Sequence, residues 1–283
     1  MKHPHAGASE YAYFLHPSAT NSKDILAFAH RGGAGLWPEN TVLACKNALL
    51  LGCRYLEIDL QLTRDCQLVV FHDVGLERTT DGRGRLDVQP YDALRRLDAA
   101  FKFAPDRDFP LRGRGVAIPT LEELIEIDSD VRFNIDLKSR RFDVAAALWR
   151  LIEKHGLHDR ILVGCAHIEA IHHFRKLSGG TVATSACFDE CLRFLLAVKL
   201  RSTRWLATPF QALQIPRQWK GIRVISERFI ESAHAHDLHV HVWTVDDLST
   251  MQEILGMGAD GIMSDRPDRL LPLVFRQEVN HVD

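Results

Sequence analysis

The sequence lacks several features that mark particular classes of protein. Its 283 residues hold only six cysteines, none in a CxxC pair, which argues against a small disulfide-bonded scaffold. Lys and Arg number 35 against 37 Asp and Glu, so the basic excess of nucleic-acid-binding proteins is missing and we expect no nucleic-acid partner. No apolar run approaches the ~18 residues of a transmembrane helix, and residues 1–23 lack the apolar core of a signal peptide. We therefore expect a cytoplasmic protein.

The composition is that of a globular protein with a hydrophobic core. Hydrophobic residues make up 46% of the chain and charged residues 25%, with a formal net charge of −2. The length suits one large domain or two small ones. The cysteines are scattered, so buried reduced thiols are the simplest interpretation. Cys187 and Cys191 are spaced to share one helix face, but two cysteines alone are a weak sign of a metal site.

Short β-rich runs alternate with helix-like segments along most of the chain. Strands are predicted at 25–30, 55–60, 68–71, 132–137, 161–165, 182–185, 212–215, 239–245 and 260–263. Helices are predicted at 41–51, with a cap at Asn40 or Thr41 and an end at Gly52, and at 120–127, where Thr120 and Glu123 have capping-box spacing. Repeated strand–helix units favour a parallel sheet wrapped in helices.

One connection is too short for that pattern. Only seven residues separate Leu60 from Leu68, whereas a parallel crossover needs about a dozen. We expect an antiparallel hairpin with a two-residue turn at Asp65-Cys66, a register that places His72 opposite Asp59. Without the returning arm, eight strands remain, and eight parallel strands in one domain predict a (β/α)8 TIM barrel with an insertion after the second strand.

Polar residues gather where the predicted strands end, which is where such barrels carry their active sites. Glu57 and Asp59 are two residues apart and therefore point to one face of their strand. The other candidates at strand ends are His30, Arg31, Asp136, Lys138 and Trp243, and the hairpin brings His72 to the same rim. Taken singly, each has an ordinary explanation as a solvated charge, a turn residue or a core aromatic. Their joint placement favours a functional site.

Three carboxylates at one site require compensation. At ~4 Å and an effective dielectric of ~20, two like charges repel by roughly 4 kcal/mol. A hard divalent cation with oxygen ligands, Mg²⁺ or Ca²⁺, removes this repulsion. Without it we expect uncompensated negative charge at Glu57, Asp59 and Asp136, so that at least one of the three stays protonated. Two histidines beside a hard cation, His30 and His72, are better suited to proton transfer than to metal ligation.

The order of these motifs resembles that of the glycerophosphodiester phosphodiesterase family, within the PLC-like phosphodiesterase superfamily. Residues 30–32 and 38–41 read HRG and PENT, like the family's opening. Further similarities are the E-x-D strand at 57–59, VVFHD at 69–73, RTTDG at 78–82, IPTL at 118–121, VWTV at 242–245 and DGIMSDRP at 260–267. The resemblance spans residues 25–271, almost the whole chain.

The resemblance implies a barrel at 25–275 between an N-terminal tail, 1–24, and a C-terminal tail, 276–283. An insertion at about 73–116 would cover the pocket. It implies roles for each candidate: metal ligation by Glu57, Asp59 and Asp136, acid–base catalysis by His30 and His72, and substrate binding by Arg31 and Lys138 at the phosphate and by Trp243 at the glycerol. Many members carry Glu where this chain has Asp136, which is one methylene shorter, so the ligand set departs from the family pattern there.

The implied reaction is metal-dependent hydrolysis of a small-molecule glycerophosphodiester to glycerol 3-phosphate and an alcohol. One alternative is a lysophospholipase D-like activity on lysolipids. Another is a zinc hydrolase of the amidohydrolase type, which needs an HxH pair. Here His239 and His241 begin a late strand, so an interior or bottom-rim position is expected for them. A catalytically inactive binding barrel predicts losses among the candidate residues, and none is lost. The apolar segment 188–200 leaves a weak membrane-surface contact open, although a helix packed on the barrel explains it better.

Overall fold

The structure is a computed structural model that describes residues 6–15, 25–139 and 142–279. The strands are β1 (Leu26–Ala29), β2 (Tyr55–Leu62), β3 (Leu68–Val70), β4 (Arg132–Leu137), β5 (Ile161–Gly164), β6 (Ala183–Thr184), β7 (Ala212–Pro216), β8 (Gln218–Trp219), β9 (Ile222–Arg223), β10 (His239–Trp243) and β11 (Gly261–Ser264). The α-helices are α1 (Val42–Leu51), α2 (Tyr91–Leu94), α3 (Leu121–Ile125), α4 (Phe142–His155), α5 (Ile168–Ser178), α6 (Phe188–Lys199), α7 (Glu227–His234), α8 (Leu248–Gly256) and α9 (Pro267–Val279).

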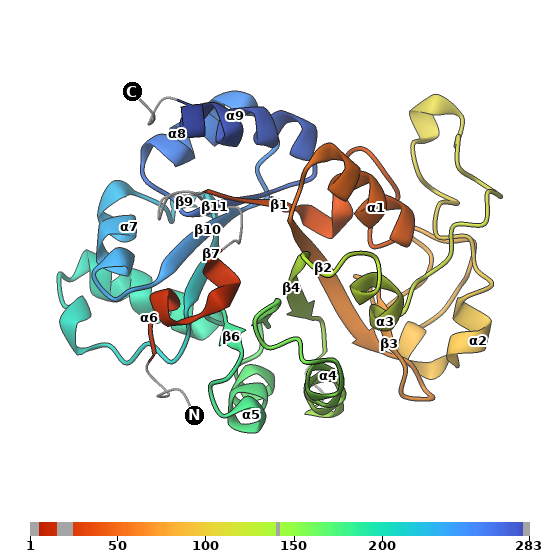
Figure 1. Ribbon diagram of the computed structural model, residues 1–283, viewed down its shortest axis with the longest axis horizontal. Helices are drawn as coiled ribbons and strands as arrows, with labels where there is room; N and C mark the ends of the chain where they lie inside the picture. Colours follow the sequence, from red (N-terminus) through yellow and green to blue (C-terminus); the bar gives the residue numbers. More distant parts are fainter. Residues whose placement is uncertain (1–5, 16–24, 140–141, 280–283) are drawn as a thin grey trace.

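Eight of these strands form a nearly closed parallel barrel in the order β6-β5-β4-β2-β1-β11-β10-β7. The two end strands meet through a parallel bridge between Ser185 and Ala212. The Gln211 amide donates to the Thr184 carbonyl at 2.9 Å and the Ala186 amide to the Ala212 carbonyl at 2.8 Å. Helices surround the strands (Figure 1). The predicted (β/α)8 barrel is therefore confirmed.

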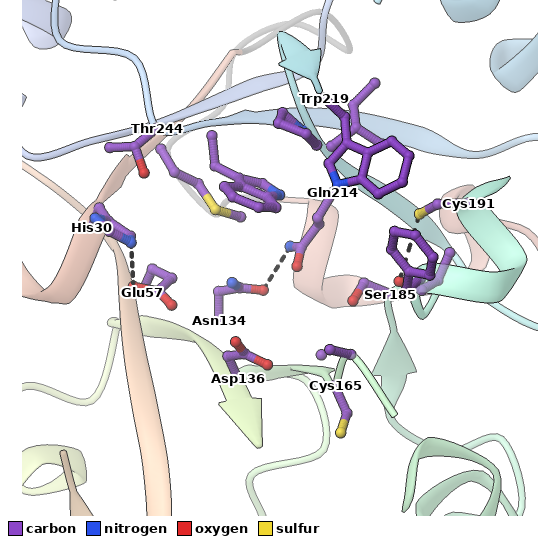
Figure 2. A pocket seen from close by; sticks show the side chains of 18 of the residues that line it. His30, Glu57, Asn134, Asp136, Cys165, Ser185, Cys191, Gln214, Trp219 and Thr244 are labelled. Atoms are coloured by element: carbon purple, nitrogen blue, oxygen red, sulfur yellow. Dashed lines mark hydrogen bonds and ion pairs between the residues drawn. The ribbon is translucent and has the colours of Figure 1, made fainter. Parts of the chain in front are cut away.

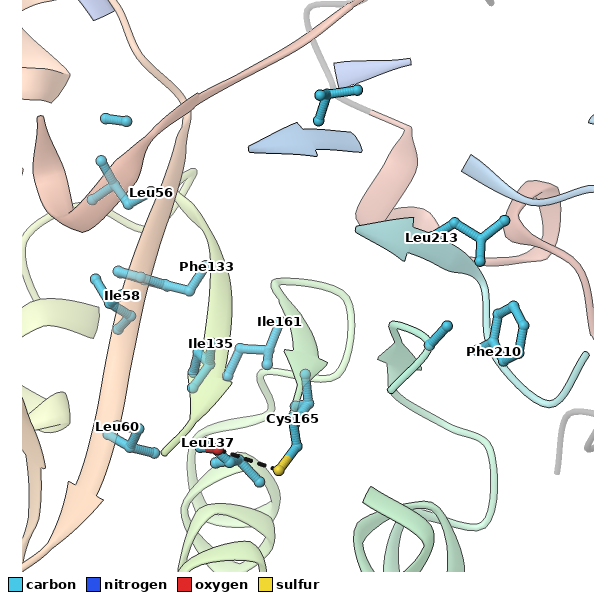
Figure 3. Packing of buried hydrophobic residues seen from close by; sticks show 14 of the residues in the cluster. Leu56, Ile58, Leu60, Phe133, Ile135, Leu137, Ile161, Cys165, Phe210 and Leu213 are labelled. Atoms are coloured by element: carbon cyan, nitrogen blue, oxygen red, sulfur yellow. Dashed lines mark hydrogen bonds between the residues drawn. The ribbon is translucent and has the colours of Figure 1, made fainter. Parts of the chain in front are cut away.

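The strands of the barrel alternate between two environments. Leu56, Ile58 and Leu60 of β2 pack with Phe133 and Ile135 of β4 in the layer beneath the helices (Figure 3). Because side chains alternate along a strand, the intervening Glu57 and Asp59 face the inside of the barrel. The hydrophobic layer thus fixes the direction in which the carboxylates of β2 point.

The local signals for helix ends act as the sequence predicts. The Thr41 hydroxyl accepts a hydrogen bond from the Ala44 amide at 3.1 Å, and α1 ends at Gly52, whose φ of 111° suits glycine. Thr120 and Glu123 form the expected capping box at α3. Within the described residues, no helix combines the length and the apolar character needed to cross a bilayer.

The β2–β3 hairpin forms, but the predicted register is wrong by one residue. Leu60 pairs with Val70, and the Phe71 amide donates to the Asp59 carbonyl at 2.9 Å, so Phe71 rather than His72 lies opposite Asp59. The turn has three residues between Thr63 and Gln67 instead of two. Its last residue, Cys66, adopts a φ of 63°, as in a type I turn completed by a left-handed residue.

Residues 73–116 follow the hairpin and project at one side of the barrel, yellow in Figure 1. They contain α2 and two short 3₁₀ helices, η4 (Leu86–Val88) and η5 (Pro105–Arg107). A small cluster that includes Leu76, Leu86, Leu94 and Ile118 packs them against Val69 of β3. The segment therefore has its own small core beside the barrel.

The end of the barrel at which the strands begin is closed by residues 6–15, which lie within the predicted N-terminal tail. They form η1 (Ala8–Glu10) and η2 (Ala12–Phe14). The Tyr13 carbonyl accepts hydrogen bonds from the Tyr55 hydroxyl at 2.9 Å and from Arg132 Nε at 3.0 Å. Tyr13 and Phe14 are buried there.

The HxH pair lies at this closed end. The rings of His239 and Phe14 are 4.3 Å apart, and those of His241 and Phe28 are 4.8 Å apart. Burial lowers the pKa of His239 and lowers that of His241 well below its ordinary value, so both imidazoles are neutral. The expected interior position of His239 and His241 is confirmed. They therefore cannot serve as the metal-binding HxH pair of an amidohydrolase-type site at the carboxyl ends of the strands.

All six cysteines are free thiols. Five are fully or partly buried, as the sequence suggests, whereas Cys66 is exposed in the hairpin turn. Burial raises the pKa of Cys45, Cys53, Cys165 and Cys191 to about 12, so these thiols stay protonated.

Candidate active site

A cavity of about 470 Å³ lies at the carboxyl ends of the parallel strands. Seven of the eight predicted site residues line it: His30, Arg31, Glu57, His72, Asp136, Lys138 and Trp243. The eighth, Asp59, has no exposed surface and contacts two of the lining residues, Arg31 and Lys138. Figure 2 shows His30 and Glu57 on one side of the cavity and Trp219 and Cys191 on the other. The structure therefore brings the predicted site residues together around one cavity.

His30 follows β1 and is held between two carboxylates. Its Nδ1 lies 2.6 Å from Asp265 Oδ1, and its Nε2 lies 3.7 Å from Glu57 Oε2. Because Asp265 only accepts, its contact places a proton on Nδ1 and directs Nε2 toward the cavity. Burial acts to lower the pKa of His30, yet the Glu57 charge and the Asp265 hydrogen bond hold it above its ordinary value.

Glu57 is buried among charges of both signs. Burial, followed by the neighbouring charge of Asp59, raises the pKa of Glu57 to about 7. Its Oε2 accepts a hydrogen bond from the Arg31 backbone amide at 3.0 Å. Arg31 has a φ of 50°, and this unusual turn is what aims its amide at the carboxylate. Glu57 is therefore a buried carboxylate that holds a proton more readily than a solvated glutamate does.

Asp59 is the most enclosed group of the site. Asn40 holds it with two hydrogen bonds: Asn40 Nδ2 donates to Asp59 Oδ2 at 2.8 Å, and the Asp59 amide donates to Asn40 Oδ1 at 3.2 Å. Two cations complete its surroundings, with Lys138 Nζ 2.8 Å from Oδ1 and Arg31 Nε 3.2 Å from Oδ2. Burial alone would raise the pKa of Asp59, but these two charges hold it below its ordinary value.

Lys138 joins Asp59 to Asp136. Its Nζ donates to Asp136 Oδ2 at 2.5 Å while lying 2.8 Å from Asp59 Oδ1. The two aspartates are register partners on β2 and β4, so one ammonium reaches both. The expectation of uncompensated negative charge is therefore wrong for Asp59 and Asp136. It holds for Glu57, whose pKa is raised by burial and by the Asp59 charge. Strand alternation predicts where the carboxylates point, but it does not predict that Lys138 and Arg31 fold onto Asp59.

An ion-pair network extends from Arg31 to His72. Arg31 Nη1 donates to Glu39 Oε1 at 2.9 Å, and Arg78 binds the same carboxylate through both terminal nitrogens at 2.7 Å. Arg78 Nε also donates to Asp73, and Asp73 Oδ1 lies 2.5 Å from His72 Nδ1. Both cavity histidines thus have an aspartate at Nδ1.

The opposite wall of the cavity is largely apolar. It is built by Ala186, Leu192, Leu195, Ile215, Pro216, Trp219 and Val224, with Phe188 at its edge. Trp243, 42% exposed, stands at the end of β10. In the floor, Gln214 Nε2 donates to Asn134 Oδ1 at 2.7 Å (Figure 2). The cavity therefore has a charged side, formed by β1 to β4, and an apolar side that includes α6 and the β8–β9 hairpin.

The segment 73–116, all of it described, contributes no residue to this cavity. The resemblance led us to expect a cover over the pocket, and the structure does not show one. The segment instead lines a separate cavity of about 350 Å³, to which it contributes Arg78, Lys102 and Arg107. Pro38 and Glu39 line the same cavity. Its link to the site is the Arg78 contact with Glu39 and Asp73.

Several functional contacts were missed in the sequence, although their motifs were recognised. Asp265 belongs to the DGIMSDRP segment, and Asn40 and Glu39 belong to PENT, yet nothing in the sequence assigned them contacts. Asn40 is 2% exposed and has a φ of 58°, and this conformation belongs to the residue that holds Asp59. The adjacent His72 and Asp73 could have predicted one of the missed contacts, since a carboxylate beside a histidine often orients its imidazole.

The donor set can be tested against a divalent cation. Asp59 Oδ1 is buried and lies 2.8 Å from the Lys138 ammonium, and Glu57 and Asp136 present further oxygens to the cavity. Oxygen donors of this kind suit Mg²⁺ or Ca²⁺. Among the described residues, however, no three His, Cys, Asp or Glu side chains converge on one point. The set fits a hard cation in chemistry, and such a cation would compete with Lys138 for Asp59 and Asp136.

Comparison with known proteins agrees with the family resemblance. The model of the glycerophosphoryl diester phosphodiesterase family matches residues 30–269. A probable glycerophosphodiester phosphodiesterase 2 of Mycobacterium tuberculosis is 32% identical over 249 residues, covering 87% of this chain and 89% of that protein. A glycerophosphodiester phosphodiesterase of Bacillus altitudinis is 31% identical over 252 residues, covering 87% and 96%.

Solved structures show the same architecture. A glycerophosphoryl diester phosphodiesterase domain from Mycobacterium tuberculosis superposes with a TM-score of 0.76 at 20% identity, covering 91% of this chain and all of that one. A phosphodiesterase of Oleispira antarctica, solved in complex with the product sn-glycerol-3-phosphate, gives a TM-score of 0.73 at 25% identity, covering 94% and 99%. This chain belongs to the glycerophosphoryl diester phosphodiesterase family, a family of enzymes that act on glycerophosphodiesters.

Proposed function

We propose that the cavity hydrolyses glycerophosphodiesters to glycerol 3-phosphate and an alcohol, with one Mg²⁺ or Ca²⁺ as cofactor. The observation that carries the proposal is the placement of two aspartate-held imidazoles, His30 and His72, on one cavity with a carboxylate and ammonium cluster. The family is in general metal-dependent. The relative crystallised with sn-glycerol-3-phosphate supports a small-molecule substrate of this kind.

The carboxylates Glu57, Asp59 and Asp136 would hold the cation. A bound cation supplies positive charge that neutralises the non-bridging phosphate oxygens. The side chains themselves provide two further cations, Arg31 and Lys138, both lining the cavity and both anchored by Asp59. Arg31 and Lys138 therefore bind the phosphate and stabilise charge that develops on its oxygens.

The two histidines move the protons. Asp265 and Asp73 each hold an imidazole through Nδ1, which leaves the Nε2 of His30 and of His72 for the substrate. One Nε2 accepts the proton of the nucleophile, which is water or the glycerol 2-hydroxyl, as that oxygen bonds to phosphorus. The other Nε2 donates a proton to the oxygen of the leaving alcohol as its bond to phosphorus breaks. Attack by the 2-hydroxyl gives a cyclic phosphate, which water then opens to glycerol 3-phosphate. The partly exposed ring of Trp243 packs against the carbon atoms of the glycerol.

A matrix of metals and substrates tests this function. The purified protein is incubated with Mg²⁺, Ca²⁺, Mn²⁺ or Zn²⁺ against several glycerophosphodiesters, and released glycerol 3-phosphate is measured. We expect activity with Mg²⁺ or Ca²⁺ and its loss on chelation. Chelation should also lower the melting temperature, because a ligand at a hundredfold excess over its Kd stabilises the folded state by about 2.7 kcal/mol. Unchanged activity and melting temperature under chelator would rule out the metal site.

The apolar side of the cavity supports a second candidate, a lysophospholipase D-like activity. Leu192, Leu195 and Val224 offer a surface that a choline or ethanolamine group does not need but an acyl chain would cover. A relative from Mus musculus, 26% identical over 274 residues, is named a lysophospholipase D. Lysophosphatidylcholine and lysophosphatidylethanolamine therefore belong in the same substrate matrix, with lysophosphatidic acid as the phosphate product.

A further inference from the structure

Helix α6 carries an apolar stripe on its outward face. Phe188, Leu192 and Leu196 are spaced four residues apart, so they lie on one side of the helix, and their exposed fractions are 45%, 39% and 50%. The buried side of α6 is a different set, which includes Phe194 and Val198 of the barrel core. The stripe is therefore additional to the face that packs on the barrel.

The stripe continues onto neighbouring segments. Leu200 follows the helix at 75% exposure, and Trp205 of η6 (Thr203–Trp205) is 79% exposed. On the other side, the Phe188 ring lies 5.4 Å from the Trp219 ring of the β8–β9 hairpin, where Ile222 is also exposed. We call this surface the α6 face: Phe188, Leu192, Leu196, Leu200, Trp205, Trp219 and Ile222. Scattered exposed apolar residues are ordinary, but seven on connected segments are not.

Positive charges predominate along the α6 face, although Asp189 beside Phe188 is exposed and Glu253 pairs with Arg217 and Arg223. The segment 192–223 holds seven Lys and Arg and no Asp or Glu. The formal net charge of the whole chain is −2, so the residues outside this segment carry a net charge of −9. The segment is therefore basic in an otherwise acidic chain. Two of the cations lie over exposed indoles, Arg204 at 4.5 Å from the Trp205 ring and Lys220 at 4.7 Å from the Trp219 ring. Apolar and indole side chains ringed by cations are typical of surfaces that bind an anionic membrane interface.

The α6 face is continuous with the cavity. Phe188, Leu192 and Trp219 belong to both, and Leu195, one residue before Leu196, lines the cavity wall. Figure 2 shows Trp219 beside this wall, across the cavity from His30. A molecule seated on the face would therefore reach the cavity along apolar contacts.

We propose that the α6 face binds the surface of an anionic phospholipid bilayer and holds the mouth of the cavity against it. The apolar side chains enter the interface, and the cations contact lipid phosphates. The advantage to the enzyme rests on the proposed function, because a glycerophosphodiester that carries an acyl chain is presented by such a surface. Bilayer binding itself does not depend on turnover, so the two can fail separately.

The test measures binding to sedimented vesicles and turnover in parallel. Vesicles of phosphatidylcholine with phosphatidylglycerol are compared with vesicles of phosphatidylcholine alone. The first variant, Leu196→Gln with Trp205→Gln, removes apolar side chains outside the cavity lining. The second, Lys199→Gln with Arg201→Gln and Arg204→Gln, removes three cations. The matched control is Leu50→Gln, which replaces a leucine of α1 that is 86% exposed.

We expect the wild type to bind the phosphatidylglycerol vesicles, less tightly as salt is raised, and the phosphatidylcholine vesicles weakly. Each cation removed should weaken binding about fivefold, and the apolar variant should lose most of it. Leu50→Gln should bind as the wild type does, and all variants should hydrolyse a water-soluble glycerophosphodiester at the wild-type rate.

No binding by the wild type, or equal losses in the Leu50→Gln control, would overturn the proposal. So would a gel-filtration shift in the Leu196 variant with vesicle binding intact, since the face would then be a contact between two copies. If binding is seen but no glycerol 3-phosphate is released, the proposed function fails and this proposal stands.

Discussion

The two sides of the cavity are held in different ways. On the charged side, most cationic and acidic groups are fixed by a neighbour of opposite sign, as Lys138 is by Asp59 and Asp136. On the apolar side, Leu192, Leu195 and Val224 are held only by packing. Because the ion pairs are mutually dependent, a change on the charged side disturbs several groups at once. The apolar side is more tolerant, so the chemistry of the reaction and the choice of substrate are assigned to separate regions.

The largest effect is expected from the histidines of the charged side. His30→Ala and His72→Ala should each lower kcat by about 10²–10⁴-fold, the usual range for a general acid or base. The double variant should lose less than the product of the two, because they serve one proton-transfer unit. Steady-state release of glycerol 3-phosphate measures all three. His155→Ala, on the surface of α4, is the control, and near wild-type turnover in either cavity variant would contradict the assignment.

Asp59 tests how far the charged side depends on ion pairs. Asp59→Asn leaves Lys138 and Arg31 without their buried partner, and removing one member of such a pair costs about 3 kcal/mol. With chelator present, the melting temperature should therefore fall below that of the wild type. Thermal melts of both proteins measure this.

The control for Asp59 is a pair of similar chemistry on the surface. Asp128 lies 3.5 Å from Arg54, and both side chains are at least one-third exposed, so Asp128→Asn should cost at most about 1 kcal/mol. If metal-free Asp59→Asn melts at or above the wild type, repulsion among the carboxylates outweighs their attraction to Lys138 and Arg31. The account of the charged side would then be wrong.

Lys138 distinguishes a phosphate contact from a purely internal role. Lys138→Met should raise KM for a glycerophosphodiester about tenfold at saturating metal, since a hydrogen bond to a charged group is lost. Lys138→Arg should recover part of the loss. Kinetics across a metal titration give the answer. An effect seen only at low metal concentration would mean that Lys138 acts on Asp59 and Asp136 alone.

The smallest effect on turnover is expected from the apolar side. Leu195→Ala should lower kcat/KM for lysophosphatidylcholine about tenfold, the value of a few buried methylenes. For glycerophosphocholine the change should stay within about twofold, because that substrate does not reach Leu195. Competition between the two substrates measures the ratio directly. Equal losses on both would show that the two sides of the cavity are not separable.

The sequence predicts what short-range patterns control. The alternation along β2 places Glu57 and Asp59 on one face, and Thr41 and Thr120 mark two helix starts. It does not predict contacts that form only when the barrel closes. Asp265 reaches His30 from 235 residues away, and Lys138 turns from its strand end onto two carboxylates.

The hairpin and α6 show the same limit at shorter range. The register of β2 and β3 depended on the backbone of Cys66, whose left-handed conformation adds a residue to the turn. The segment 188–200 was recognised as apolar, but its two faces could be separated only when Phe194 was seen packed in the core and Leu196 exposed. Burial on a helix is set by the neighbours, and these lie outside the segment.

The most direct test of the account is which bond of the substrate breaks. Glycerophosphoethanolamine is digested with the purified protein and Mg²⁺ or Ca²⁺, and the phosphorus products are followed by ³¹P NMR. We predict glycerol 3-phosphate as the final phosphorus product, with free ethanolamine, and no conversion by His72→Ala on the same time scale. Phosphoethanolamine with free glycerol, or an unchanged spectrum with both metals, would contradict it.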